Sequence, residues 1–186
     1  MSVAYWEEFL RTWDEERSHI LALLPSDRIE LAFFKEMRVA SAYVEPAPVE
    51  RIQRAEDRLG HELPLDLKTF YEVSNGWPFI GMSNLAVVGV DQLSTIPSEP
   101  RDYIRDIDEH FSIENESFIS VRCRPAALLL SNISNFGFCV ANPTHTNSWE
   151  YACVEFGARS DRYGCFLDFM KSARWYCLHY LRGHLE

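Results

Sequence analysis

The sequence predicts an α+β protein in which N-terminal helices and a C-terminal helix flank a small, mostly antiparallel sheet. Three observations predict this class. Apolar residues recur at helical spacing over the first 76 residues. Short apolar and β-branched runs, separated by turn residues, fill the middle of the chain. The last stretch, residues 165–181, returns to a helical pattern.

The first helix is predicted by a stripe of apolar residues at steps of three and four positions, which only Arg17 interrupts. The stripe consists of Val3, Trp6, Leu10, Trp13, Ile20 and Leu24. Pro25 ends this helix, and the residues from Asp27 onward predict a second one. We expect residues 1–45 to form a helical extension that packs on the core of an α+β domain at 46–186.

Two further helices follow a proline-containing break. The third helix begins near Val49 and stops at Gly60, because glycine can take the left-handed conformation that closes a helix end. Pro64 starts the fourth helix, since proline fits the first helical turn. This helix carries Phe70 and stops at the Asn75-Gly76 turn.

Four stretches predict strands, namely residues 85–90, 126–131, 136–142 and 149–156. Their hairpin-length spacings indicate antiparallel pairing. The final helix has a predicted apolar side. That side is formed by Phe166, Phe169, Met170, Ala173, Trp175 and Cys177.

The chain carries a net charge of −10, from 18 basic and 28 acidic side chains. This charge disfavours direct binding to a nucleic acid and is compatible with a basic protein partner. The acidity is concentrated, because residues 1–116 hold 23 acidic and 11 basic side chains, whereas residues 117–186 hold 5 and 7.

The stretch 99–116 has seven acidic and two basic side chains, interleaved with apolar residues. It is either a solvated surface or an electrostatic contact for a partner. The residues selected for such a contact are Asp102, Asp106, Asp108 and Glu109.

The start of the chain lacks the pattern of a signal peptide, and its apolar runs are too short to span a bilayer. The five cysteines are an odd number and contain no CxxC pair. We therefore expect a cytoplasmic protein whose thiols are reduced and pack in the core, with no membrane association. The oligomeric state is not indicated.

No pattern predicts catalytic residues, metal ligands or a bound cofactor, so we do not expect an enzyme. Cys139 and His145 are separated by an Asn-Pro turn, which argues against an organised nucleophile and base. Cys177 and His179 are two positions apart on a helix, so their side chains diverge. The chain has no GxSxG elbow, P-loop or dinucleotide fingerprint.

Several motifs, in order, resemble the SUKH superfamily, which includes the Smi/Knr regulators of cell-wall assembly. Residues 51–64 (RIQRAEDRLGHELP) resemble its helix followed by Leu-Gly and Leu-Pro, and residues 74–77 (SNGW) resemble its Asn-Gly motif. Residues 127–131 and Asn142-Pro143 resemble the Leu-rich strand and the turn of bacterial members, and a closing strand and helix follow. The resemblance covers roughly residues 49–170 and implies a sheet flanked by helices.

The resemblance also implies a function. Many bacterial members resemble immunity proteins that bind and neutralise polymorphic or contact-delivered toxins, often nucleases, whereas fungal members act as regulatory scaffolds. We therefore expect an intracellular immunity protein whose acidic surface meets a basic toxin. The alternative is a regulatory or scaffold domain with an endogenous protein partner. Trp77 and Trp149 are candidate anchors for a partner if they are exposed, and core packing is the other interpretation of both.

Overall fold

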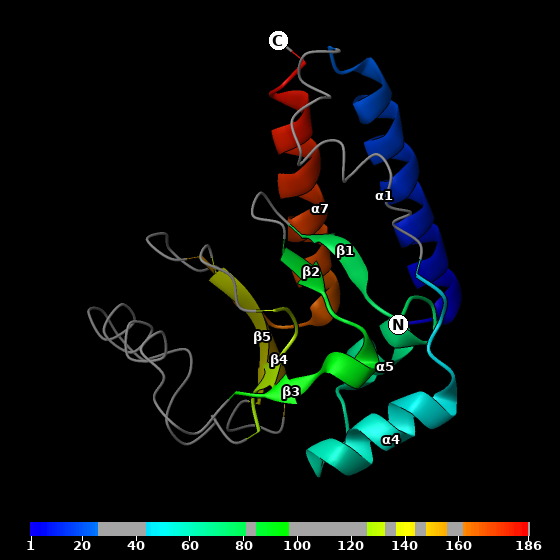
Figure 1. Ribbon diagram of the computed structural model, residues 1–186, viewed down its shortest axis with the longest axis vertical. Coiled ribbons are helices and arrows are strands. Elements are labelled where there is room, and N and C mark those ends of the chain that lie inside the picture. Colours follow the sequence, from blue (N-terminus) through cyan, green and yellow to red (C-terminus); the bar gives the residue numbers. More distant parts are fainter. Residues whose placement is uncertain are drawn as a thin grey trace, which may run out of the picture.

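The computed structural model describes residues 1–25, 44–80, 85–96, 126–132, 137–143, 148–155 and 162–185 (Figure 1). Its helices are α1 (Val3–Leu23), α4 (Val49–Leu59), α5 (Leu65–Tyr71), the short 3₁₀ helix η1 (Val90–Gln92) and α7 (Phe166–Arg182). Its strands are β1 (Trp77–Ile80), β2 (Leu85–Val87), β3 (Ser94–Thr95), β4 (Leu128–Leu129), β5 (Gly137–Pro143), β6 (Trp149–Glu155) and β7 (Arg162–Tyr163). The predicted second helix and the acidic stretch 99–116 lie outside the described residues.

The strands that the structure describes all pair antiparallel. Five of them form one sheet in the order β3-β4-β5-β6-β7, and β1 and β2 form a separate two-stranded sheet. Figure 1 shows α1 and α7 running side by side, with the larger sheet near the start of α7. The predicted α+β class, with an antiparallel sheet between N-terminal helices and a C-terminal helix, is confirmed.

Helix α1 buries most of the predicted apolar stripe. Ser2 caps its start, because the Ser2 Oγ atom accepts a hydrogen bond of 3.3 Å from the Tyr5 N–H. The buried members of the stripe are Trp6, Leu10, Trp13, Ile20 and Leu24. Val3 is 38% exposed, whereas Arg17 is only 3% exposed and pairs with Asp14 at 2.6 Å. The aliphatic stem of Arg17 therefore continues the stripe while its guanidinium group keeps a carboxylate partner.

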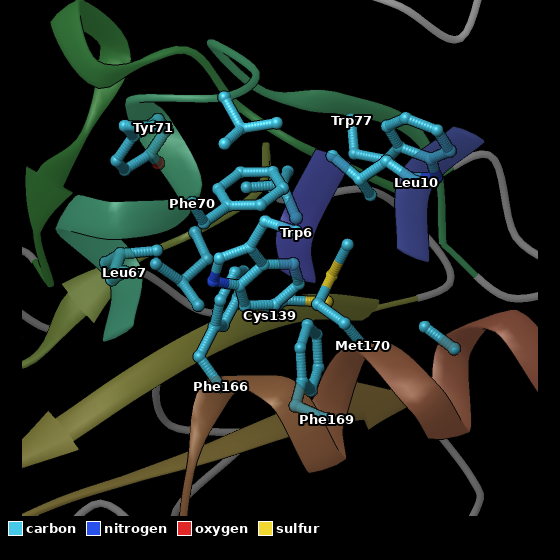
Figure 2. Packing of buried hydrophobic residues seen from close by; sticks show 14 of the residues in the cluster. Trp6, Leu10, Leu67, Phe70, Tyr71, Trp77, Cys139, Phe166, Phe169 and Met170 are labelled. Carbon is cyan, nitrogen blue, oxygen red and sulfur yellow. The ribbon is translucent and has the colours of Figure 1, made fainter. Parts of the chain in front are cut away.

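A cluster of aromatic rings joins α1, α5 and α7 (Figure 2). The Phe70 ring of α5 lies 5.4 Å from Trp6 of α1 and 5.1 Å from Phe166 of α7, edge to face in both pairs. These three side chains are 0% exposed. Helix α1 therefore shares one core with α5 and α7, while the domain boundary between residues 45 and 46 stays a prediction.

The Asn75-Gly76 turn ties the helices to the strands. The Asn75 Oδ1 atom accepts a hydrogen bond of 2.8 Å from the Val90 N–H at the start of η1. Gly76 has a φ of 116°, and a Cβ atom there would lie 2.7 Å from the carbonyl oxygen of Val87. Both the backbone conformation and the close approach of β2 therefore require glycine at this position.

We expect Gly76→Ala to lower the free energy of unfolding by about 1–3 kcal/mol. The backbone at Gly76 is strained for any residue with a Cβ atom, and the new methyl group would lie too close to the carbonyl oxygen of Val87. Urea unfolding followed by circular dichroism measures this loss. Gly60→Ala is the matched control, since Gly60 has a φ of 77° but nothing within 4 Å of the missing Cβ atom. It should lose about 1 kcal/mol from the backbone alone. Equal losses in the two variants would contradict the role assigned to the Val87 contact.

Helix α7 buries one side against the sheet and α1. Its buried side chains include Phe166, Phe169, Met170, Ala173 and Cys177. The prediction that Trp175 belongs to this side is wrong, because Trp175 is 59% exposed. A helix turns by about 100° per residue, which places Trp175 about 200° from Ala173. Burial raises the pKa of the Cys177 thiol to about 11, so this thiol is protonated at neutral pH.

Candidate binding surface

A pocket of about 280 Å³ opens where the start of α1, the start of α5, strand β6 and the turn before α7 meet. Its lining residues are Met1, Pro64, Leu65, Asp66, Trp149, Tyr151 and Gly164. We call it the Leu65 pocket. Its lining comes from segments far apart in the sequence, so the folded chain creates it rather than any single motif.

The turn between α4 and α5 sets the position of Leu65. Gly60 closes α4 in the left-handed conformation, as the sequence predicts. The Glu56 carboxylate accepts a hydrogen bond of 2.7 Å from the Leu63 N–H and pairs with Lys68 at 2.6 Å. Leu65 then follows as the first residue of α5, with 76% of its surface exposed.

Asp66 joins three elements in the lining of the pocket. Its Oδ1 atom accepts hydrogen bonds from the Tyr151 hydroxyl group at 2.7 Å and from the Leu67 N–H at 3.0 Å. Its Oδ2 atom accepts one of 2.6 Å from the N–H of Phe166, the first residue of α7. A carboxylate at the positive end of a helix is favourable. Asp66 therefore holds the start of α7 and strand β6 against α5.

Burial raises the pKa of Tyr151 above its ordinary value, and the Asp66 carboxylate raises it further. The Tyr151 hydroxyl group therefore stays protonated at neutral pH and donates to Asp66. General acid–base catalysis works best with a group whose pKa lies near the operating pH. The Asp66–Tyr151 pair instead has the properties of a structural link.

Trp149 is a half-buried aromatic residue at the edge of the pocket. It begins β6 opposite Pro143, and its ring lies 5.7 Å from that of His61. The next residue, Glu150, pairs with Arg162 of β7 at 2.7 Å. The strand pairing and the His61 ring hold Trp149, which stays partly exposed. A fixed, partly exposed aromatic residue is typical of an anchor in a protein interface.

The predicted partner-binding residues have different positions. Trp77 is 1% exposed and its ring lies 5.0 Å from Trp13, so it belongs to the core and lacks the exposure that an anchor requires. Trp149 borders the Leu65 pocket. The predicted residues outside the described part of the chain are Asp102, Asp106, Asp108 and Glu109. Their role stays a prediction.

Leu65 and Met1 are not among the residues predicted from the sequence. A signal for Leu65 was present, since it lies two positions before Leu67 and therefore off the helical stripe that Leu67 and Phe70 form. An apolar side chain off the buried stripe of a helix is exposed. Met1 is 50% exposed and reaches the pocket only through the placement of α1, which no local pattern indicates.

A second group of exposed aromatic side chains lies on α7. Trp175 and Tyr176 are 59% and 42% exposed, and the Trp175 ring stacks on that of His179 at 4.9 Å. Trp175 follows Phe166 by nine residues, which corresponds to about 14 Å along the helix axis. This group is therefore a surface separate from the Leu65 pocket, which lies at the start of α7.

The ranges that the structure describes contain no group of three or more His, Cys, Asp or Glu side chains that could hold a metal ion. A search of the same ranges finds no helix that is long and apolar enough to cross a membrane. What the Leu65 pocket offers a ligand is apolar surface from Met1, Leu65 and Trp149, beside polar atoms that already have partners.

The fold and the pocket together define an α+β domain with an apolar hollow at the junction of its helices and its sheet. The family model described as the SMI1 / KNR4 family (SUKH-1) matches residues 46–172, more than half of the chain. The chain therefore belongs to this family, and the predicted membership of the SUKH superfamily is confirmed. No curated protein and no solved structure matches the chain. The matched range includes the pocket residues from α5 and β6, whereas α1 precedes it.

Proposed function

We propose that this protein is an immunity protein, which binds and neutralises a polymorphic or contact-delivered toxin by protein–protein contact and is not an enzyme. Membership of the SUKH superfamily supports a protein-binding role. The observation that carries the proposal is Leu65, which is 76% exposed beside a pocket and a fixed tryptophan. Full burial of a leucine side chain stabilises a fold or a complex by about 1.5–3 kcal/mol. Because Leu65 stays largely exposed after folding, most of this stabilisation is available to a partner that covers it.

Binding through this surface requires no catalytic step, because the contact is non-covalent. Asp66 and Tyr151 bond each other, so a partner does not have to satisfy them. Met1, Leu65 and Trp149 supply the apolar contact, in which a few well-packed anchors carry most of the binding energy. The partner then presents an apolar side chain that fits a pocket of about 280 Å³.

Charge defines the second property of the partner. The chain has a net charge of −10, and 23 of its acidic side chains lie in residues 1–116. An acidic surface accelerates association with a basic protein more than it raises the affinity. The toxin class that fits is a basic protein, such as a nuclease, with an apolar contact residue. We place this encounter in the cytoplasm.

The alternative function is a regulatory or scaffold domain for an endogenous protein partner. It is favoured by the family match itself, because the matching model carries the names of SMI1 and KNR4. The same apolar pocket serves either function. The two functions predict different outcomes for a cell that expresses the toxin, because only an immunity protein allows such a cell to grow.

Co-expression with the toxin encoded by a neighbouring gene tests the proposal. We expect the two proteins to co-purify, and cells that express the toxin to grow only when this protein is also present. A chain that neither binds that toxin nor protects the cells would overturn the proposal. A stable complex with one defined endogenous protein, without protection, would establish the scaffold alternative.

We expect Leu65→Asp to weaken toxin binding at least about tenfold, because a carboxylate in an apolar contact loses its hydration. Titration calorimetry measures the affinity. Val49→Asp is the matched control, since Val49 is also the first residue of a helix and is 67% exposed, but it does not line the pocket. Both variants should fold, because an acidic residue is favourable in a first helical turn. Wild-type affinity of Leu65→Asp would remove the pocket from the interface.

We expect the combined change of four acidic residues to the matching amides to slow toxin association at low salt without unfolding the domain. These residues are Asp102, Asp106, Asp108 and Glu109. The difference should shrink as salt rises, because the screening length falls to about 10 Å at 0.1 M. Stopped-flow measurements at several ionic strengths give the rates. If variant and wild-type rates agree at low salt, the stretch 99–116 is only a solvated surface.

A further inference from the structure

Two cysteines face each other across the β5–β6 hairpin. The register of these strands pairs Cys139 directly with Cys153. Side chains opposite each other in an antiparallel pair point to the same face of the sheet. Here it is the face toward the main core, because Cys139 belongs to the cluster shown in Figure 2 and Cys153 packs against that cluster.

The backbone hydrogen bonds of Cys139 show whether Cys139 and Cys153 are a hydrogen-bonded or a non-hydrogen-bonded pair. Its N–H donates to the Ser131 Oγ atom at 2.7 Å, and its carbonyl oxygen accepts from the Leu130 N–H at 2.8 Å. Both backbone groups therefore point toward β4 and away from β6. Cys139 and Cys153 are thus a non-hydrogen-bonded pair. The pair Pro143–Trp149, four positions along β5, is of the same kind, which suits a proline that has no N–H to donate.

Non-hydrogen-bonded pairs are the closer kind, with Cα atoms about 4.5 Å apart. Disulfides join residues whose Cα atoms are roughly 4.4 to 6.8 Å apart. Cys139 and Cys153 are both thiols in the structure. A bond between their sulfur atoms therefore requires rotation of side chains and no change of strand register.

We propose that Cys139 and Cys153 form a reactive dithiol, which a small-molecule disulfide of the glutathione type oxidises to an intrachain disulfide. Cys153 is the entry point, because it is half-buried whereas Cys139 is 0% exposed. In the pairing that the structure describes, β7 meets only Tyr151 and Ala152 of β6. Cys153 lies beyond this covered part of the strand.

The reaction proceeds by two thiol–disulfide exchanges. Cys153, as the thiolate, attacks one sulfur atom of glutathione disulfide, and the S–S bond of the reagent breaks as one glutathione thiolate leaves. Cys139 then loses its proton and attacks the Cys153 sulfur atom, which expels the second glutathione. The two protein thiols are oxidised to one disulfide, one glutathione disulfide is reduced to two thiols, and the two protein protons pass to the departing glutathiones.

The other described cysteines lack the features of this pair. These are Cys165 and Cys177, and burial raises the pKa of both thiols, that of Cys177 to about 11. Neither residue lies in a strand opposite another cysteine. They serve as internal controls for the selectivity of the oxidation.

The disulfide fastens together the two strands of the hairpin whose second strand carries Trp149 and Tyr151. A cross-link of this kind restricts the unfolded chain and raises the stability of the folded one. Cytoplasmic disulfides are usually transient and redox-sensing. The pair therefore gives the protein a state that depends on the redox poise of its surroundings, whatever partner it binds.

The test uses the full chain with Cys123→Ser, because Cys123 lies outside the described residues. The folded protein is incubated with glutathione disulfide, its remaining thiols are alkylated, and it is digested with a protease that cleaves after glutamate. Glu150 lies between Cys139 and Cys153 in the sequence, so the disulfide joins two peptides that mass spectrometry identifies. We expect this linked pair, no retained glutathione, and a higher melting temperature that a reductant reverses.

Cys139→Ser in the same background distinguishes the two exchange steps. It should keep one glutathione on Cys153 and show no rise in melting temperature. The proposal is overturned if the parent chain also keeps glutathione on Cys153 with no linked peptides. It is equally overturned if neither cysteine reacts until the chain unfolds, or if Cys165 or Cys177 is oxidised first. None of these readouts involves a binding partner.

Discussion

Replacement of Phe70 by alanine is expected to lower the free energy of unfolding by about 3–5 kcal/mol. Phe70 is 0% exposed, and its ring lies edge to face with Trp6 and Phe166. The change removes buried apolar surface and leaves a cavity between α1, α5 and α7. Each lost aromatic pair adds about 0.5–1.5 kcal/mol beyond the burial of its area. Three helices meet at this ring, so none of them can close the cavity alone.

The control for Phe70→Ala is Leu65→Ala, five residues earlier on the same helix. Leu65 is 76% exposed, so its truncation should change stability by no more than about 0.5 kcal/mol. Urea unfolding of both variants gives the comparison. If Phe70→Ala does not fold, Phe70→Leu keeps most of the volume and should show an intermediate loss. Equal stability of wild type, Leu65→Ala and Phe70→Leu would contradict the position given to Phe70 in the core.

The α-helices that the structure describes could be predicted because each signal lies within a few residues of its effect. Gly60 ends α4 as predicted, whereas α5 ends at Tyr71, a few residues before the Asn75-Gly76 turn at which the sequence predicts its end. Most predicted strands also appear at their expected positions. The stretch 85–90 is an instructive exception, since β2 stops at Val87 and η1 begins at Val90. The reason is non-local, because Asn75 takes the Val90 N–H that a longer strand would use.

The exposure of two tryptophans was not predicted, for different reasons. Trp77 follows a turn, so the sequence leaves its exposure open, and tertiary packing, including the contact with the Trp13 ring, makes it a core residue. Trp175 is a different case, because the helical period alone places it about 200° from Ala173, and the prediction that put it on the buried side did not apply that period. Strands β3 and β7 were not predicted, since two residues cannot display a period, whereas the equally short β4 lies within the predicted apolar run 126–131.

Asp66 is the clearest example of a role that no local pattern reveals. In the sequence it is one acidic residue in the first turn of a short helix, a common position. In the fold it binds Tyr151 and Phe166, which are 85 and 100 positions away. This one carboxylate links α5, β6 and α7 at the Leu65 pocket, in addition to the packing of aromatic rings between these elements.

We expect Asp66→Asn to lower the free energy of unfolding by about 2–4 kcal/mol, although it changes almost no volume. The carboxylate accepts from the N–H groups of Leu67 and Phe166 with different oxygen atoms. An amide has only one oxygen atom, so in either orientation its NH₂ group opposes one of these backbone donors. Rotation of the side chain cannot repair this conflict, because a backbone N–H cannot reverse its direction.

Tyr151→Phe separates the hydrogen bond between Tyr151 and Asp66 from the hydrogen bonds that Asp66 accepts from the backbone. It removes the hydrogen bond to Asp66 and leaves both backbone hydrogen bonds in place, so it should cost about 1–2 kcal/mol, less than Asp66→Asn. The double variant should lose less than the sum of the single losses, because both single changes remove the charge-assisted hydrogen bond from Tyr151 to the Asp66 carboxylate, and this bond can be lost only once. Strictly additive losses, measured by urea unfolding of all four proteins, would mean that this bond contributes nothing. In that case Asp66 would hold the pocket together only through the backbone of α5 and α7.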